Sequence, residues 1–161
     1  MSSTSTVTIL PYTPALKEHI KTLNLEWLTK FFKVEPKDEK VLSDPQGQII
    51  DQGGFIFYAQ YQDEIVGTAS LLKMEEGVFE LSKMAVTDAV QGLGIGKELL
   101  QHCFAFAEKE GFSKIVLYSN RKLHSAIHLY RKYGFVEIEL EDGVYERADI
   151  KMEKPLTQNT I

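Results

Sequence analysis

The sequence predicts an α/β fold, in which a mixed, mostly antiparallel sheet of six or seven strands is flanked by four helices. Three observations carry the prediction. Strand-like stretches joined by short polar turns occupy the middle of the chain, and a glycine-rich turn then leads into a helix with one apolar face. After that helix, strand-like and helical stretches alternate.

The N-terminal part predicts one short strand and two helices. Residues 7–10 form the strand, and Thr13-Pro14 is typical of a helix start, because threonine can cap free N–H groups and proline fits the first turn. Apolar side chains then repeat at helical spacing to about residue 32. Pro36 begins the second, shorter helix, which Asp44-Pro45 ends.

The central part predicts three antiparallel strands, over residues 55–61, 65–74 and 78–86. The third strand changes phase, since its apolar residues are odd-numbered before Ser82-Lys83 and even-numbered after it. Side chains alternate between the two faces of a strand. The change therefore indicates either burial on both faces or a β-bulge, which inserts one residue.

A glycine-rich segment follows this strand, Gln91-Gly92-Leu93-Gly94-Ile95-Gly96-Lys97. Free N–H groups and partial positive charge at a helix N-terminus bind phosphate, and glycines let the backbone approach it. A Walker loop is excluded, because three residues separate the outer glycines and Glu98 follows the lysine. The dinucleotide pattern is also broken, since Lys97 stands where its third glycine belongs. A ligand-free strand-to-helix turn is the alternative interpretation.

The C-terminal part predicts two more helices and three more strands. The first helix covers residues 95–109, and Gly111 is its expected cap. The remaining elements are a strand over 113–119, a helix over 123–133 and strands over 135–140 and 147–152. We expect a single domain over residues 1–161, in which residues 1–5 and 155–161 are loose tails.

Composition excludes several classes of protein. The net charge of −5 and the lack of a basic block argue against nucleic acid as a partner. The chain has no apolar run of membrane-spanning length and no signal-peptide pattern at its start, so we expect a cytoplasmic protein without membrane contact. The single cysteine, Cys103, excludes an internal disulfide. No histidine has a carboxylate or cysteine at ligand spacing, so no metal is expected.

Two motifs resemble the signatures of the GNAT family of acetyl-CoA-dependent N-acetyltransferases. Gln91, Gly94 and Gly96 match Q-x-x-G-x-G, the pyrophosphate loop of that family. The segment from Ala126 to Phe135 matches its second signature, A-x-x-L-Y-x-x-x-G-F. The resemblance covers roughly residues 7–153.

The resemblance implies a site for acetyl-CoA between the two central parallel strands. A bulge in the strand over 78–86 would splay this strand from its parallel neighbour and open a V-shaped gap. Backbone groups of Met84, Ala85 and Val86 would bind pantetheine, and residues 91–97 would bind the pyrophosphate. Many members have a pantetheine-binding asparagine where this chain has Leu123. Asn120 either substitutes for it or is a strand-end turn residue.

The resemblance also implies catalytic roles for two side chains. Glu80 matches the general-base glutamate of some members, and Tyr130 matches the general-acid tyrosine that faces the CoA sulfur. The N–H group of Met84 would stabilise the developing oxyanion. From the residues alone, Glu80 could instead face solvent or pair with Lys83, and Tyr130 could be a core residue.

We therefore expect an enzyme that transfers the acetyl group of acetyl-CoA, its cosubstrate, to a primary amine of a small molecule or peptide by direct attack. The alternative is a non-catalytic acyl-CoA-binding module or sensor, and the loop spacing disfavours a nucleotide-binding domain. The identity of the acceptor and the formation of a homodimer stay open. Three aromatic residues could line an acceptor pocket or pack on the core, namely Trp27, Phe31 and Phe32.

Overall fold

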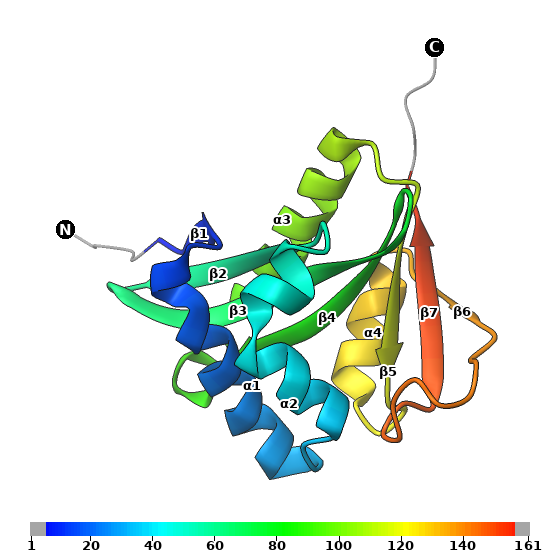
Figure 1. The fold of residues 1–161 in the computed structure, drawn as a ribbon, viewed down its shortest axis with the longest axis horizontal. Helices are drawn as coiled ribbons and strands as arrows, with labels where there is room; N and C mark the ends of the chain where they lie inside the picture. The colour runs from blue at the N-terminus through cyan, green and yellow to red at the C-terminus, as the bar shows by residue number, and fades with distance from the viewer. Residues whose placement is uncertain (1–5, 157–161) are drawn as a thin grey trace.

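The computed structural model describes residues 6–156, which form a seven-stranded sheet (Figure 1). The order across the sheet is β1-β2-β3-β4-β5-β7-β6. Strands β4 and β5 are parallel, and the other neighbouring strands are antiparallel, so the predicted fold class is confirmed. The strands are β1 (Thr8–Pro11), β2 (Phe55–Tyr61), β3 (Glu64–Glu75), β4 (Val78–Val86), β5 (Lys114–Ser119), β6 (Val136–Ile138) and β7 (Ile150–Pro155).

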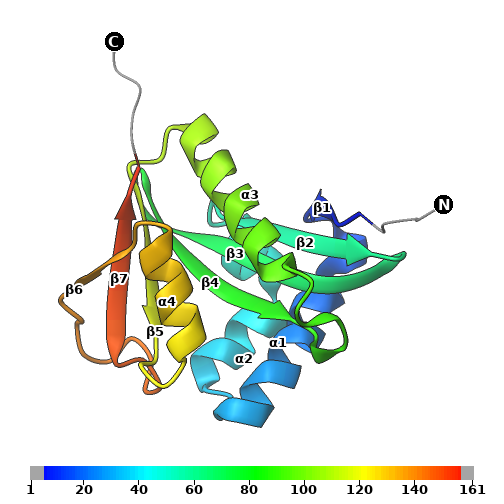
Figure 2. The same ribbon diagram turned by 180° about the vertical axis from the view of Figure 1, so that it is seen from behind.

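Helices cover both faces of the sheet. Helices α1 (Lys17–Phe31) and α2 (Pro36–Ser43) lie on the face seen in Figure 1. Helices α3 (Ile95–Glu110) and α4 (His124–Lys132) lie on the opposite face, seen in Figure 2. The four predicted helices are confirmed. Thr13 occupies the expected N-cap position and Pro14 begins the first turn, but this turn is a 3-10 turn, Pro14–Leu16, that precedes α1, and the Thr13 side chain makes no capping hydrogen bond.

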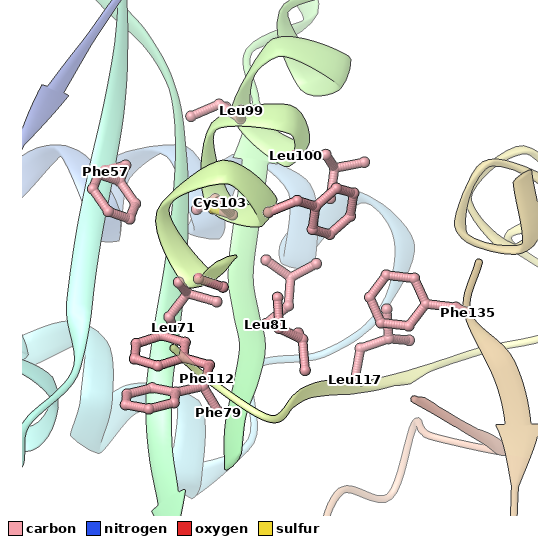
Figure 3. Packing of buried hydrophobic residues seen from close by; sticks show 14 of the residues in the cluster. Phe57, Leu71, Phe79, Leu81, Leu99, Leu100, Cys103, Phe112, Leu117 and Phe135 are labelled. Carbon is pink, nitrogen blue, oxygen red and sulfur yellow. The ribbon is translucent and has the colours of Figure 1, made fainter. Parts of the chain in front are cut away.

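Two apolar clusters fill the space between the sheet and the helices. Near the end of α3 the rings of Phe79 and Phe112 stack with centroids 3.8 Å apart, and Cys103 of α3 is fully buried in the same cluster (Figure 3). The cluster on the opposite face packs α1 and α2 against β2, and it consists of Ile20, Leu28, Val41, Leu42, Ile49, Ile56 and Tyr58. The sheet is therefore fixed on both sides of its central strands.

Strand β4 carries the bulge that the change of phase indicates. Thr68 of β3 pairs with Ala85, whereas Ser70 pairs with Ser82, so β4 has one residue more than β3 in this interval. Lys83 adopts a left-handed conformation with φ of 49° at this position. The parallel pairing of β4 with β5 covers residues 78–80 and 114–116, and beyond it the strands separate. The predicted bulge and V-shaped gap are confirmed.

The C-terminal strands differ from the prediction. Strand β6 has three residues, and β7 begins at Ile150 rather than at Arg147. The intervening loop, residues 139–149, reaches α2, where Arg147 pairs with Glu35 and Asp38. Arg147 therefore belongs to this loop and not to the start of the last strand.

The expected C-terminal tail is also partly wrong. Pro155 belongs to β7 and pairs with Lys114 of β5, because the antiparallel ladder continues to the end of that strand. Leu156 is buried, and its N–H group donates to the carbonyl oxygen of Ser113 at 2.9 Å. The rest of the two expected tails, residues 1–5 and 157–161, lies outside the described residues.

Candidate active site

A pocket opens where β4 and β5 separate. Four residues that the sequence analysis assigns to the site line it, namely Glu80 and Met84 of β4, Asn120 after β5, and Tyr130 of α4. Trp27 and Phe32 from the region of α1 also line it, whereas Phe31 is exposed and does not. The V-shaped gap therefore brings together residues that are far apart in the sequence, such as Trp27 of α1 and Tyr130 of α4.

Glu80 is a buried carboxylate at the point where the parallel pairing ends. The residue is only 5 % exposed, and the hydroxyl of Tyr145 donates a hydrogen bond to its carboxylate at 3.3 Å. Burial raises the pKa of Glu80, against the positive charge of Lys83 and hydrogen bonds from Ser82 and Tyr145. A carboxylate with a raised pKa is a better proton acceptor near neutral pH. Neither solvent exposure nor an ion pair with Lys83 describes this residue, because Lys83 pairs with Asp38.

The bulge presents Met84 to the same pocket. The strand register gives Lys83 and Met84 no partner on β3, since the pairing passes from Ser82 directly to Ala85. The carbonyl oxygen of Lys83 accepts a hydrogen bond from the side chain of Asn24 at 3.1 Å, which fixes the bulge to α1. Ala85 and Val86 are paired with β3 and lie outside the pocket lining.

Tyr130 enters the pocket from α4. Its ring packs edge-on against Phe135 with centroids 5.7 Å apart, which fixes the direction of the side chain. Burial raises the pKa of the Tyr130 phenol to about 12. The phenol is therefore protonated across the physiological range and can donate a hydrogen bond.

The glycine-rich segment forms an open turn at the start of α3. Gly92 and Gly94 have φ values of 88° and 76°, which residues with a Cβ rarely adopt. A Cβ added at either position would meet no atom within 4 Å, so the protein itself leaves the space above them open. Gln91 donates a side-chain hydrogen bond to Asp88 at 2.9 Å, which holds the beginning of the turn.

The rest of the segment forms the first turn of α3, whose first N–H groups have no partner within the helix. Ile95 is buried and anchors this turn, whereas Leu93 and Lys97 are exposed. A Cβ added at Gly96 would lie 3.6 Å from the Cε atom of Met84. The glycine-rich turn is therefore adjacent to the pocket wall, although its residues do not line the pocket.

Asn120 lines the pocket and also serves as a turn residue. Its side-chain nitrogen donates to the carbonyl oxygen of Arg147 at 2.6 Å, and its side-chain oxygen accepts from the N–H group of Lys122 at 3.0 Å. Leu123, at the position of the family asparagine, lines the same pocket. A role for Asn120 toward pantetheine stays a prediction.

A buried ionic cluster closes the pocket on the side of α2. Asp38 accepts hydrogen bonds from both terminal nitrogens of Arg147, at 2.6 and 2.8 Å, and from the ammonium of Lys83 at 2.7 Å. Burial alone would raise the pKa of Asp38, but the hydrogen bonds from Arg147 and Lys83 outweigh it and lower the pKa to about 2. Glu35 also pairs with Arg147, at 2.9 Å.

Sequence reasoning missed this cluster and its neighbour Tyr145. One signal was available, because Glu35-x-x-Asp38 before a helical stretch follows the spacing of a capping box. The N–H group of Glu35 indeed donates to Asp38 at 2.9 Å. The partners of Asp38 lie 45 and 109 residues away, at Lys83 and Arg147, and no local pattern connects them.

Between residues 6 and 156, the structure contains no group of three or more His, Cys, Asp or Glu side chains arranged to hold a metal ion. Within the same range, none of the helices is long and apolar enough to cross a membrane.

The comparisons with known proteins agree with the geometry. "Uncharacterized N-acetyltransferase YjgM" of Escherichia coli is 30 % identical over 109 residues, and the match spans 65 % of this chain and 65 % of that relative. A GNAT-family acetyltransferase from Staphylococcus aureus shares the fold, with a TM-score of 0.84 and 24 % identity over 94 % of this chain and 100 % of that one.

A PaiA N-acetyltransferase from Thermoplasma acidophilum, solved in complex with coenzyme A, has a TM-score of 0.73 and 19 % identity, covering 93 % of this chain and 99 % of that one. The family model for the acetyltransferase (GNAT) family matches residues 20–135. That interval includes the bulged strand, the glycine-rich turn and the whole of α4. The chain belongs to the acetyltransferase (GNAT) family.

Proposed function

We propose that this protein transfers the acetyl group of acetyl-CoA to a primary amine of a small molecule or peptide by direct attack. The observation that carries the proposal is the pocket between the splayed strands, where buried Glu80, Met84 of the bulge and Tyr130 face one space. A general base, an oxyanion donor and a donor for the leaving group are what acyl transfer to an amine requires.

Acetyl-CoA would lie along the path from the glycine-rich turn to this pocket. The N–H groups at the start of α3 bind its pyrophosphate, and Gln91, Gly92, Leu93, Gly94, Ile95, Gly96 and Lys97 form that site. Lys97 is exposed and adds a positive charge. The pantetheine arm passes Met84, Ala85 and Val86 along β4, and Asn120 contacts it from the end of β5. Acetyl-CoA supplies the activated acetyl thioester as a cosubstrate, and no metal takes part.

The acceptor must lose a proton before it can attack, because an alkyl ammonium has a pKa of roughly 10. Glu80 accepts that proton directly or through a water molecule. The amine nitrogen then bonds to the thioester carbon, and the N–H group of Met84 stabilises the oxyanion. The carbonyl re-forms as the carbon–sulfur bond breaks, the nitrogen and Glu80 release their protons to solvent, and the products are an amide and CoA.

Tyr130 stabilises the departing sulfur. Its pKa of about 12 lies above the value of ~8.5 for an ordinary thiol, so complete proton transfer from the phenol to the thiolate is uphill. The phenol therefore contributes mainly a hydrogen bond to the thiolate as the carbon–sulfur bond breaks, and solvent completes the protonation. The Tyr130 hydroxyl should therefore speed the reaction without being essential for it.

We place the enzyme in the cytoplasm, where a chain whose cysteine is a free thiol is usual. The test is release of the CoA thiol from acetyl-CoA by purified protein across polyamines, amino acids, aminoglycosides and peptides. We expect thiol release that depends on one class of amine. Binding of CoA without amine-dependent release would instead favour an acyl-CoA-binding module.

A further inference from the structure

Tyr145 contacts the carboxylate that the proposed function uses as its base. This residue lies in the loop between β6 and β7 and lines the same pocket as Glu80. Its hydroxyl donates a hydrogen bond to the Oε2 atom of Glu80 at 3.3 Å, although the two residues are 65 positions apart. The contact joins the C-terminal loop to the central strand at the point where β4 leaves β5.

Three cations hold the ring of Tyr145 in place. The ammonium groups of Lys37 and Lys83 lie 5.0 and 5.1 Å from the ring centroid, and the guanidinium of Arg147 lies 4.9 Å from it. Cations at such distances over an aromatic face are attracted by its negative quadrupole. The ring of Tyr118 packs edge-on against Tyr145, with centroids 5.8 Å apart. These contacts fix the ring so that its hydroxyl lies beside Glu80 and Ser82.

The loop that carries Tyr145 is fixed to the N-terminal turn of α2. The carboxylate of Glu35 accepts hydrogen bonds from the N–H groups of Glu146 and Arg147, at 3.0 and 3.3 Å. The guanidinium of Arg147 forms two parallel hydrogen bonds with Asp38, which is completely buried. Bidentate pairs of this kind add geometric specificity as well as energy. The α2 clamp, formed by Glu35, Asp38 and Arg147, thus sets the position of the loop.

We propose that Tyr145 is a positioning residue for acetyl transfer, which holds the carboxylate of Glu80 toward the acceptor and is itself held in place by the α2 clamp. The inference rests on the proposed function, in which Glu80 is the base. A hydrogen bond donated to a carboxylate stabilises its ionised form, so the phenol also favours the state that accepts a proton.

The other groups that act on Glu80 come from two elements. Lys83 and Ser82 belong to its own strand, and Lys37 belongs to α2. These groups and Tyr145 oppose the effect of burial, which raises the pKa of Glu80. Ser82 also shares a hydrogen bond with the Tyr145 hydroxyl. Removal of that hydroxyl takes away one of the groups that oppose burial while Glu80 stays buried, so we expect the pKa of Glu80 to rise further.

Tyr145→Phe tests the inference, because phenylalanine keeps the ring among its cations and removes the hydrogen bond. We expect kcat to fall about 10-fold while KM for acetyl-CoA changes little, as for an interaction that matters mainly in the transition state. The acidic limb of kcat/KM should move to higher pH by about one pH unit, the size of one hydrogen bond to a charged group. An NMR titration of the ¹³C-labelled Glu80 carboxyl should show the same shift without any turnover.

Tyr118→Phe is the matched comparison, because its hydroxyl bonds Glu141 from the same wall of the pocket. The acidic limb of this variant should stay at the wild-type pH. An unchanged limb and an unchanged Glu80 titration in Tyr145→Phe would overturn the inference. A wild-type protein without amine-dependent turnover would contradict the proposed function instead, and the NMR titration would still decide whether Tyr145 acts on Glu80.

Discussion

Lys83 of the β4 bulge and Asp38 of α2 form an ion pair of 2.7 Å, with side chains 3 % and 0 % exposed. The pair holds the left-handed bulge residue against the helix that also anchors the C-terminal loop. Removal of one partner from a buried ion pair leaves an uncompensated charge in a medium that solvates it poorly. The shape of the pocket next to α2 therefore depends on a contact between residues that belong to neither family signature.

Asp38→Asn should lower the free energy of unfolding at pH 7 by about 3–5 kcal/mol, measured by urea denaturation, because Lys83 and Arg147 lose their buried counter-charge. The neighbouring variant Glu39→Gln is the control. Glu39 pairs with Lys21 at 3.6 Å on the surface, with 58 % of its side chain exposed. Its loss should cost less than about 1 kcal/mol. Similar losses in both variants would contradict a special role for the buried pair.

The same carboxylate gives a prediction for the pH dependence of stability. The folded pKa of Asp38 is about 2, below its ordinary value of 3.8. A depressed pKa contributes stability that is present above the unfolded value and is lost as the pH falls toward the folded value. Wild-type protein should lose about 2 kcal/mol more than Asp38→Asn between about pH 5 and pH 1, measured by urea denaturation at each pH. Parallel pH profiles for the two proteins would show that Asp38 is not responsible.

Gly94→Val should abolish binding of CoA, measured by calorimetry, because the new side chain occupies the open space above the loop and strains a φ of 76°. Gly111→Val is a closely matched control. Gly111 has a φ of 78° at the other end of α3, and a Cβ there also meets no atom within 4 Å. Both variants should lose similar stability, while Gly111→Val keeps its affinity for CoA. Wild-type affinity in folded Gly94→Val would remove the loop from the site.

Glu80→Gln should lower kcat/KM at neutral pH by about 10²-fold, because the acceptor ammonium loses its base. The deficit should shrink as the pH approaches roughly 10, where more of the amine is already neutral. Steady-state kinetics from pH 6 to pH 10 would check this, with Glu75→Gln at the exposed end of β3 as the control. A deficit that is equal at every pH would indicate that Glu80 positions the acceptor and does not take its proton.

Tyr130→Phe should lower kcat by about 10- to 100-fold with little change in KM for acetyl-CoA, because it removes one hydrogen bond to the departing sulfur. Tyr133→Phe, on the same helix, removes a hydroxyl that contacts Gln101 at 3.1 Å outside the pocket. Steady-state kinetics should give the control the kcat of the wild type. If Tyr130→Phe matched it, Tyr130 would be a packing residue, and solvent alone would protonate the thiolate.

The parts of the site that could be predicted from the sequence are those with a local pattern. The change of phase at Ser82-Lys83 can be seen in consecutive residues, and it indicates the bulge that the strand register shows. The glycine-rich turn is likewise local, because its strand, turn and helix are contiguous. Most of the second signature, including Tyr130, lies on α4, so the position of Tyr130 in the pocket follows once the order of elements is known.

The side of the pocket next to α2 could not be predicted, because its contacts depend on tertiary structure. Arg147 carries a strand-like context in the sequence, yet its pairing with Glu35 and Asp38 draws the loop away from the sheet. The position of Pro155 near the end of the chain predicts a loose tail, but the ladder with Lys114 includes it. Both differences arise from partners more than 40 residues away, which spacing rules do not reach.

Acetyl transfer to nitrogen in the pocket between β4 and β5 is the activity that we propose for this protein. The most direct test incubates the protein with acetyl-CoA carrying ¹³C in the acetyl group and with the amine that gives the strongest thiol release, followed by mass spectrometry and NMR of the products. We predict one labelled amide for each CoA released, formed by the wild type and strongly reduced in Glu80→Gln. Label that stays in acetyl-CoA, or appears as free acetate in place of the amide, would contradict acetyl transfer to an amine in this pocket.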